Sequence, residues 1–163
     1  MRRSHNAARP ALVVSMAVAI ALAGCHRDPE PAPHVRAKQV FHLNPYEPDF
    51  GYSQAVLIDK TLYISGSVAA DETGRLVAAG DMAGQMRAAY STIRRTLEAH
   101  GAGFEAVVKE TIYTTDMEGL LKASDLRFEY YDKGRLPAAS WVQVQRLVNP
   151  GFLVQIEVVA ELP

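Results

Sequence analysis

The chain contains one cysteine, Cys25, whose thiol is the group best suited to covalent chemistry. A single cysteine excludes an internal disulfide, a zinc site built on several thiolates and a dithiol redox centre. Three of the five histidines, His26, His34 and His42, lack the paired spacing of metal ligands. We therefore expect no metal site and no cofactor, and the role of Cys25 must follow from its neighbours.

The residues before Cys25 have the pattern of an exported amino terminus. Arg2, Arg3 and Arg9 are the charged residues of this region, and residues 12–23 are uncharged and apolar. This apolar run is too short for a membrane-spanning helix, which needs about 20 residues, but it suits the core of a signal peptide. We therefore expect residues 1–24 to be a signal peptide.

Residues 22–25 read Leu-Ala-Gly-Cys and resemble the lipobox of bacterial lipoproteins. The resemblance implies that the peptide is cut before Cys25, that the thiol receives diacylglycerol, and that the new amino group is acylated. The alternative is an ordinary signal peptide followed by a chance cysteine. His26 stands where an aspartate usually retains such lipoproteins in the inner membrane. The resemblance therefore favours an outer-membrane anchor facing the periplasm, with the lipid bilayer as partner and inner-membrane anchoring as the alternative.

Residues 25–38 are expected to form a tether, and residues 39–163 the folded domain. The tether has prolines at alternate positions, Pro29, Pro31 and Pro33, which disfavour helix and sheet. Beyond residue 24 the chain carries 14 basic and 18 acidic side chains, a net charge of −4. Such a body lacks the cationic field that nucleic-acid binding needs, so we expect no nucleic-acid partner.

The folded part alternates between strand and helix patterns. Apolar side chains spaced by three and four residues predict a helix from an Asp81 cap to about residue 100, with this stripe toward the core: Met82, Met86, Tyr90, Ile93 and Leu97. A second helix is expected from Asp116 to Gly134, with Leu121, Ser124, Phe128 and Tyr131 aligned and Leu120 beside them. Strands are predicted at residues 54–58, 62–65, 75–78, 107–115, 140–144 and 153–160. This order predicts an α+β fold with two helices on one face of a mixed sheet.

Motifs of hydrolases and nucleotide-binding proteins are absent from the sequence. There is no glycine-rich phosphate loop and no Gly-x-Ser-x-Gly elbow. Seven short motifs instead occur in the order and spacing of the RidA (YjgF) family, at residues 52–55, 62–66, 73–74, 97–101, 108–113, 136–140 and 156–160. The resemblance implies a chorismate-mutase-like α+β sandwich, usually a homotrimer with ligand clefts between subunits. It also implies hydrolysis of reactive 2-imino acids to 2-oxo acids and ammonia.

The same resemblance implies a cleft lined by Tyr52, Ser65, Gly66, Ser124, Ala139, Ser140, Trp141 and Gln155. In the family an arginine grips the substrate carboxylate, and a glutamate activates the attacking water. Their positions are occupied here by Ala139 and Gln155, so both roles are vacant. Trp141 is expected to narrow the cleft and to provide an aromatic wall.

Binding of a different small polar metabolite is the function we expect, with Gln155 and Ser140 supplying hydrogen bonds. The imino acids arise from cytoplasmic enzymes, so a periplasmic protein has less need of their hydrolysis. A non-catalytic scaffold or protein-interaction module is another alternative.

A deaminase that uses substituted groups is the remaining alternative. Arg127 or Arg135 would then bind the substrate carboxylate, and Glu157 or Glu110 would serve as acid or base. The candidate catalytic residues on this hypothesis are Gln155, Glu157 and Arg127.

Overall fold

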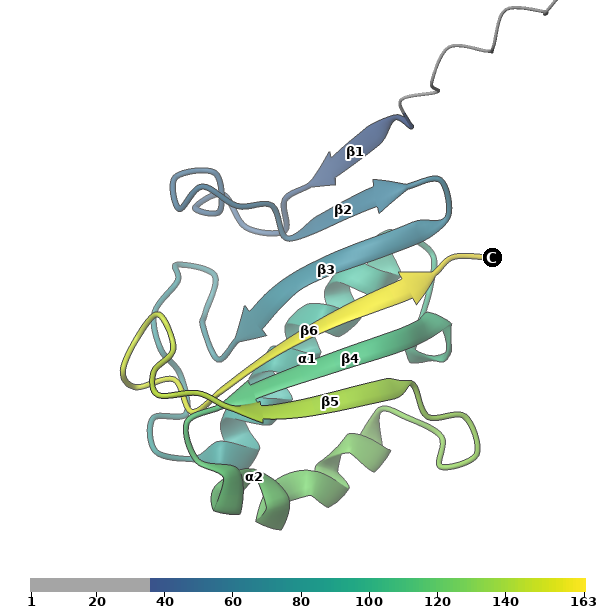
Figure 1. Cartoon of the computed structure of the whole chain (residues 1–163). Helices are drawn as coiled ribbons and strands as arrows, with labels where there is room; N and C mark the ends of the chain where they lie inside the picture. The colour runs from purple at the N-terminus through teal and green to yellow at the C-terminus, as the bar shows by residue number, and fades with distance from the viewer. Residues whose placement is uncertain (1–35) are drawn as a thin grey trace, which may run out of the picture. The chain divides into compact units, whose positions relative to one another are not determined.

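Six strands form one mixed sheet in a computed structural model that describes residues 36–163 (Figure 1). The spatial order is β1-β2-β3-β6-β4-β5, and every neighbouring pair is antiparallel except β4 and β5, which are parallel. The strands are β1 (Lys38–Phe41), β2 (Ala55–Ile58), β3 (Thr61–Val68), β4 (Val107–Thr114), β5 (Ala138–Gln143) and β6 (Val154–Glu161). The expected signal peptide, Cys25 and most of the tether lie outside the described residues.

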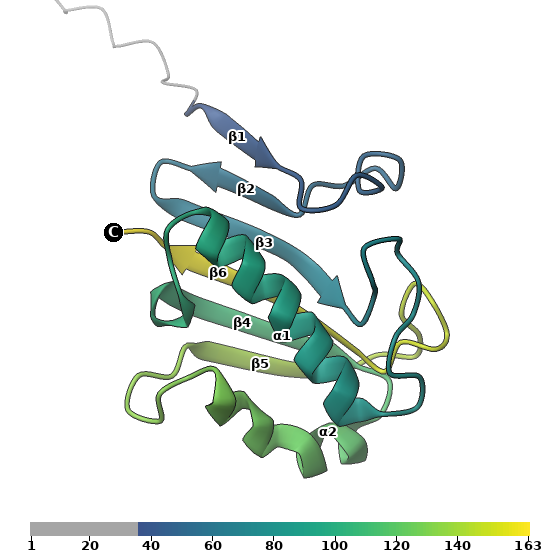
Figure 2. The same ribbon diagram turned by 180° about the vertical axis from the view of Figure 1, so that it is seen from behind.

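Two helices cover one face of this sheet, as Figure 2 shows from behind. The helical elements are α1 (Met82–Ala99), η1 (Phe104–Ala106), α2 (Met117–Ala123) and η2 (Ser124–Glu129), where η denotes a 3₁₀ helix. Asp81 caps α1 by accepting a hydrogen bond from the Gly84 amide at 3.0 Å, and Asp116 caps α2 in the same way. The expected α+β fold is confirmed. No helix in the described part is long and apolar enough to cross a membrane.

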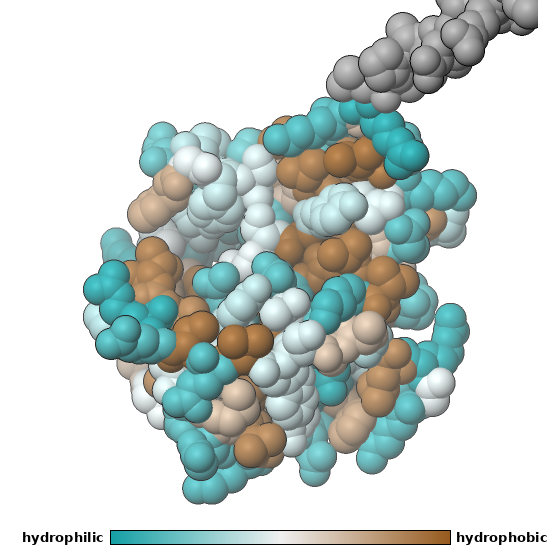
Figure 3. Space-filling view, in the orientation of Figure 1, coloured by the Kyte–Doolittle hydropathy of each residue, from teal (hydrophilic) through white to brown (hydrophobic). Residues whose placement is uncertain are grey.

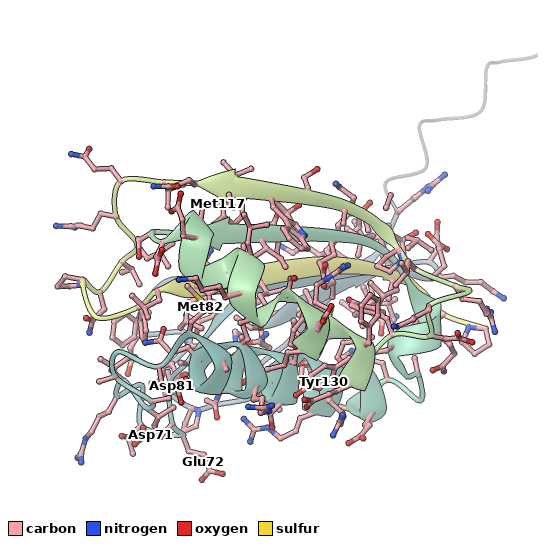
Figure 4. All side chains as sticks on the ribbon, turned by 90° about the horizontal axis from the view of Figure 1, so that it is seen from below. Asp71, Glu72, Asp81, Met82, Met117 and Tyr130 are labelled. Atoms are coloured by element: carbon pink, nitrogen blue, oxygen red, sulfur yellow. The ribbon has the colours of Figure 1, made fainter. Side chains whose placement is uncertain are left out.

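The core lies between α1 and the central strands. All five residues of the predicted α1 stripe are buried, which confirms that prediction. On β6 the buried side chains alternate with side chains that face away from the helices, as expected of a strand with one covered face. Figure 4 views the packing from below, with Asp81 and Met82 at the start of α1 and Met117 at the start of α2.

The second predicted helix is wrong in its length and in its buried face. The α-helix ends at Ala123 and the chain continues as the 3₁₀ helix η2. Leu120 and Tyr131 are buried as expected, but Leu121 and Phe128 are 54% and 38% exposed, and Arg127 is buried instead. A 3₁₀ helix has about 3.0 residues per turn instead of 3.6, so Phe128, on η2, does not keep the direction of a stripe spaced for an α-helix. Leu121 lies on α2 itself, where Leu120 is the buried residue.

Two other segments differ from the prediction. Residues 75–78 form no strand but only an isolated bridge between Ala70 and Leu76. The chain turns there into α1, with Ala78 and Gly80 at positive φ (53° and 74°). Strand β1, which the sequence did not suggest, begins at Lys38 within the expected tether and completes the β2 edge of the sheet.

The sheet face opposite the helices is uncovered in the single chain (Figure 3). Apolar side chains gather there in patches among polar ones, and Tyr63 is 48% exposed. Gln155, Glu157 and Lys109 alternate with buried neighbours on β6 and β4, which places them on this side. The groups available for chemistry therefore lie on this face and in the loops at its ends.

Candidate functional site

An aromatic cavity of about 240 Å³ lies where β3 and β6 meet two loops, residues 42–54 and 144–153. The first loop contributes Tyr46, Phe50 and Tyr52, and the second contributes Phe152. Tyr46 and Phe50 meet edge to face with ring centroids 5.9 Å apart. The cavity thus has aromatic side chains from both loops, and we refer to it below as the aromatic cavity.

Gln155 supplies the amide of this cavity. It lies on β6 opposite Val68 of β3, and its side chain packs on the backbone of Gly66 so closely that a Cβ at Gly66 would overlap the amide. Gln54 and Gln85 use their amides in hydrogen bonds within the fold. Among residues 36–163 the amide of Gln155 has no such partner, so it can bond to a molecule in the cavity.

No charged side chain lines the aromatic cavity among the residues that the structure describes. Burial raises the pKa of Tyr52, and Tyr46 and the Glu47 carboxylate raise it further, so Tyr52 is a neutral phenol at ordinary pH. Glu47 is fully buried and accepts hydrogen bonds from the amides of Leu43 (3.0 Å) and Asn44 (2.8 Å). The cavity is therefore uncharged and adjacent to a buried carboxylate.

A second, more polar cavity of about 280 Å³ lies on the uncovered sheet face. Ser65, Lys109 and Glu157 are among the residues that line it. The Tyr113 hydroxyl donates to Glu157 Oε1 at 3.2 Å, and Lys109 Nζ donates to the Ser140 hydroxyl at 2.7 Å. This sheet-face cavity holds a carboxylate and an ammonium group, the ionisable groups that the aromatic cavity lacks.

Glu110 and Arg127 form a buried ion pair beneath the helices. Arg127 Nε donates to Glu110 Oε2 at 2.8 Å, Nη2 lies 2.7 Å from the same oxygen, and the Tyr90 hydroxyl donates to Oε1 at 2.9 Å. Burial opposes the charge of Arg127, but the Glu110 carboxylate outweighs it and the pKa of Arg127 is raised. The guanidinium also lies over the ring of Trp141, 5.3 Å from its centroid. The charges of Glu110 and Arg127 therefore pair with each other inside the fold and are not available to a ligand.

Burial, followed by the Glu110 carboxylate, raises the pKa of Tyr90 and Tyr131. Tyrosines of the unfolded chain ionise near pH 10, so stability is complete below about pH 10 and is lost as pH rises further. We expect the free energy of unfolding to fall by about 1.4 kcal/mol per pH unit for each such tyrosine. Urea unfolding from about pH 9 to about pH 11 measures this slope.

Tyr131→Phe is the informative variant for this pH dependence. The Tyr131 hydroxyl is buried and makes no hydrogen bond within the described chain, so its removal should change stability by about 1 kcal/mol or less at neutral pH. The variant should lose one tyrosine's share of the alkaline slope. An unchanged slope would mean that Tyr131 ionises in the folded protein.

The model of the family described as Endoribonuclease L-PSP matches residues 43–162. The chain belongs to this family. It is 33% identical over 109 residues to the 2-iminobutanoate/2-iminopropanoate deaminase of Rattus norvegicus, which covers 67% of this chain and 78% of the rat protein. The L-PSP family is the RidA/YjgF family expected from the motifs, so that recognition is confirmed.

Solved structures of the L-PSP family share the fold. A YjgF-family protein of Mycobacterium tuberculosis has a TM-score of 0.66 at 29% identity, over 77% of this chain and 100% of that protein. A Rid-family protein of Yersinia pestis has a TM-score of 0.70 at 33% identity, with the same coverage of each chain. The RidA/YjgF fold is therefore shown for this chain.

Three of the eight residues that the L-PSP resemblance placed in one cleft line the aromatic cavity: Tyr52, Gly66 and Gln155. Ser65 lines the sheet-face cavity instead, and its hydroxyl donates to the Ser53 carbonyl at 2.7 Å. Within a single chain the aromatic cavity therefore receives Gly66 from β3, Gln155 from β6 and Tyr52 from the loop before β2.

The other four residues lie elsewhere in the single chain. Ser140 on β5 is bound by Lys109, and Trp141 alternates to the helix-covered side, where it contacts Arg127. Ala139 is exposed on the same edge strand. The hydroxyl of Ser124 donates to the carbonyl of Leu121 within the same helical segment.

The aromatic wall of the cavity consists of residues that sequence reasoning missed. Tyr46, Phe50 and Phe152 line it, whereas Trp141, expected to provide such a wall, does not. The available signal was the group of three aromatic residues within positions 46–52, interspersed with a proline and a glycine. Turn-forming residues among exposed aromatics are typical of binding loops.

The substituted groups of the deaminase hypothesis have different environments. Arg127 and Glu110 are buried and paired with each other. Glu157 is accessible on the sheet face, and Arg135 lines a separate cavity beside Tyr130. Within residues 36–163, no three histidine, cysteine, aspartate or glutamate side chains are grouped to hold a metal ion.

Proposed function

We propose that this L-PSP family protein binds a small metabolite in the aromatic cavity and lacks the imine hydrolysis for which its deaminase relatives are named. The observation that carries the proposal is the amide of Gln155 in an uncharged cavity. An amide does not act as a base at ordinary pH, and the exposed methyl group of Ala139 cannot bind a carboxylate. Binding remains possible for such a cavity when hydrolysis is not.

The proposal includes a homotrimer with the cleft between subunits. Phe50 and Val148, on opposite loops at the mouth of the aromatic cavity, are 72% and 73% exposed in the single chain. The sheet face is uncovered as well, and apolar surface of this kind favours contact with another copy. Assembly would also add residues of β5, such as Ser140, to a cleft that one chain forms only in part.

Hydrolysis of 2-iminopropanoate by the full chain tests the loss of activity. We expect the wild type to react at the background rate and the Ala139→Arg, Gln155→Glu variant to exceed it by at least tenfold. The variant regains a bidentate partner for the carboxylate and a base for the water. Release of ammonia measures the rate.

A matched control is the Ala139→Arg, Gln143→Glu variant, which carries the same charges. Gln143 is exposed at the end of β5, outside both cavities, so this variant should stay at background. All variants should have the oligomeric state of the wild type in light scattering. Wild-type hydrolysis well above background would contradict the binding proposal.

Hydrolysis by the wild type would support a second candidate function, a deaminase that uses substituted groups. The specific observation in its favour is Glu157, an accessible carboxylate that shares the sheet-face cavity with the Lys109 ammonium. Glu157 would activate water and Lys109 would attract the substrate carboxylate. The third candidate, a scaffold or interaction module, would be supported by a trimer that binds no metabolite.

We also propose that the domain is anchored by acylated Cys25 to the outer membrane, facing the periplasm, and has no nucleic-acid partner. Expressed in a Gram-negative bacterium, the wild type should incorporate labelled palmitate and sediment with membranes. Cys25→Ser should abolish both, since only a thiol forms the thioether and several acyl chains are needed for durable anchoring. Labelling of the Cys25→Ser variant would contradict this assignment.

A further inference from the structure

We infer that the aromatic cavity selects an uncharged, single-ring molecule with a carboxamide or cyclic amide edge. This inference rests on the proposed binding function and names its ligand class. It follows from three features of the cavity: its aromatic walls, an amide with no hydrogen-bond partner in the described chain, and a lining without cationic side chains.

The walls favour a flat ring. Tyr46 lies beside Gly74, where an added Cβ would come within 3.7 Å of the tyrosine ring. Phe50 meets that ring edge to face, and Phe152, which is 4% exposed, closes the floor. Drug-sized ligands occupy pockets of about 300–1,000 Å³, so the part of the cleft that one chain forms, about 240 Å³, suits a single ring.

The amide of Gln155 favours a ligand with one donor and one acceptor side by side. A side-chain amide offers both an N–H donor and a carbonyl acceptor. A carboxamide or cyclic amide can therefore pair with it through two parallel hydrogen bonds. The close packing of Gln155 on Gly66 restricts the amide and so reduces the entropy lost on binding.

The charges disfavour a carboxylate ligand. The lining contains no arginine, lysine or histidine in the part of the chain that the structure describes. The buried carboxylate of Glu47 lies close enough to Tyr52 to raise the pKa of its phenol. His42 Nδ1 lies 3.5 Å from the Glu47 carboxylate but does not line the cavity, so a bound anion would contact no cationic side chain of the lining.

Benzamide and benzoate test the inference because they have the same shape and differ in charge and donor. Binding to the full chain is measured by ligand-observed NMR titration. We expect benzamide to bind at least tenfold more tightly than benzoate. Gln155→Leu should weaken benzamide binding by about fivefold to tenfold, the loss expected for one or two hydrogen bonds.

Variants at two phenylalanines show where benzamide binds. Phe50→Ala should weaken benzamide, because it removes a wall of the cavity, whereas Phe128→Ala, at an exposed phenylalanine on η2, should not. Gln143→Leu is the matched control for Gln155→Leu, since Gln143 is exposed on β5. Circular dichroism confirms that each variant is folded before its affinity is compared.

Equal affinities, tighter binding of benzoate, or no binding of either probe at millimolar concentration would overturn the inference. The same NMR readout with a bacterial metabolite extract separates this failure from that of the proposed function. Extract components that bind while benzamide does not would overturn the ligand class alone. If no component bound either, the proposed binding function would fail as well.

Discussion

Replacing Arg127 with methionine should reduce the free energy of unfolding by about 3–5 kcal/mol. The substitution preserves most of the side-chain length but leaves the carboxylate of Glu110, which has no exposed surface, without its cation. Tyr90 would then be the remaining donor to that carboxylate among the described side chains. The cost is large because a buried charge without a partner keeps its desolvation penalty and loses its attraction. Urea unfolding at neutral pH measures the change.

Arg87→Met is the matched control. Arg87 pairs with Glu129 at 2.9 Å, but both side chains are about half exposed to water (54% and 51%). Solvent screens this pair, so its loss should be small compared with that of Arg127. Losses of equal size in the two variants would contradict the burial argument.

If Arg127→Met alone does not fold, the double variant Glu110→Leu, Arg127→Met still tests the role of the ion pair. Replacing both members of a buried ion pair with apolar residues is often neutral or stabilising. We therefore expect the double variant to recover much of the lost stability, less the hydrogen bond of Tyr90. A double variant as unstable as the single one would show that the pair itself is not the source of the loss.

Gln85→Met should reduce the free energy of unfolding by a similar amount, about 3–5 kcal/mol. Gln85 is fully buried on α1. Its Nε2 donates to the carbonyls of Gly151 (2.9 Å) and Ala78 (3.3 Å), and its Oε1 accepts from the Leu153 amide (2.8 Å). Methionine has nearly the same shape but leaves the Gly151 carbonyl and the Leu153 amide without this partner, and each such group costs about 1–3 kcal/mol when buried. The Ala78 carbonyl keeps its hydrogen bond from the Asp81 amide.

The same substitution should disturb the aromatic cavity, because Gln85 ties the loop of residues 144–153 to α1 and to Ala78. Phe152 lies between Gly151 and Leu153, two of the residues that Gln85 holds. We expect faster proteolysis of residues 144–153 in the variant, in addition to its lower urea midpoint. Gln143→Met, at an exposed site, should change neither. Unchanged proteolysis in Gln85→Met would show that the loop is held by other contacts.

The two cavities of the single chain bear on the choice between binding and hydrolysis. The aromatic cavity holds Gln155 and no charge, whereas Glu157 and Lys109 lie on the sheet face. The deaminase hypothesis therefore requires hydrolysis to take place in the sheet-face cavity and not in the aromatic cavity. The binding proposal needs only the cavity that already contains Tyr52 and Gly66, two of the family's motif positions.

Local patterns were sufficient to predict much of the fold from the sequence. The apolar stripe of α1 and the capping residues Asp81 and Asp116 depend on neighbours within a turn or two. They can therefore be predicted from one short stretch of sequence. The prediction for Phe128 failed because the change to a 3₁₀ helix at Ser124 alters the residues per turn. Strand β1 was missed because it is short and depends on pairing with β2.

The sequence by itself determined the family, the α+β fold, and the presence of Tyr52, Gly66 and Gln155 among the motifs of the site. Tertiary structure alone decided which of these residues meet, because β3, β6 and the two loops are distant in the chain. It also showed that Arg127 is bound to Glu110, 17 residues away, and is therefore unavailable to a ligand. Such pairings depend on packing between elements, which no local pattern of residue types encodes.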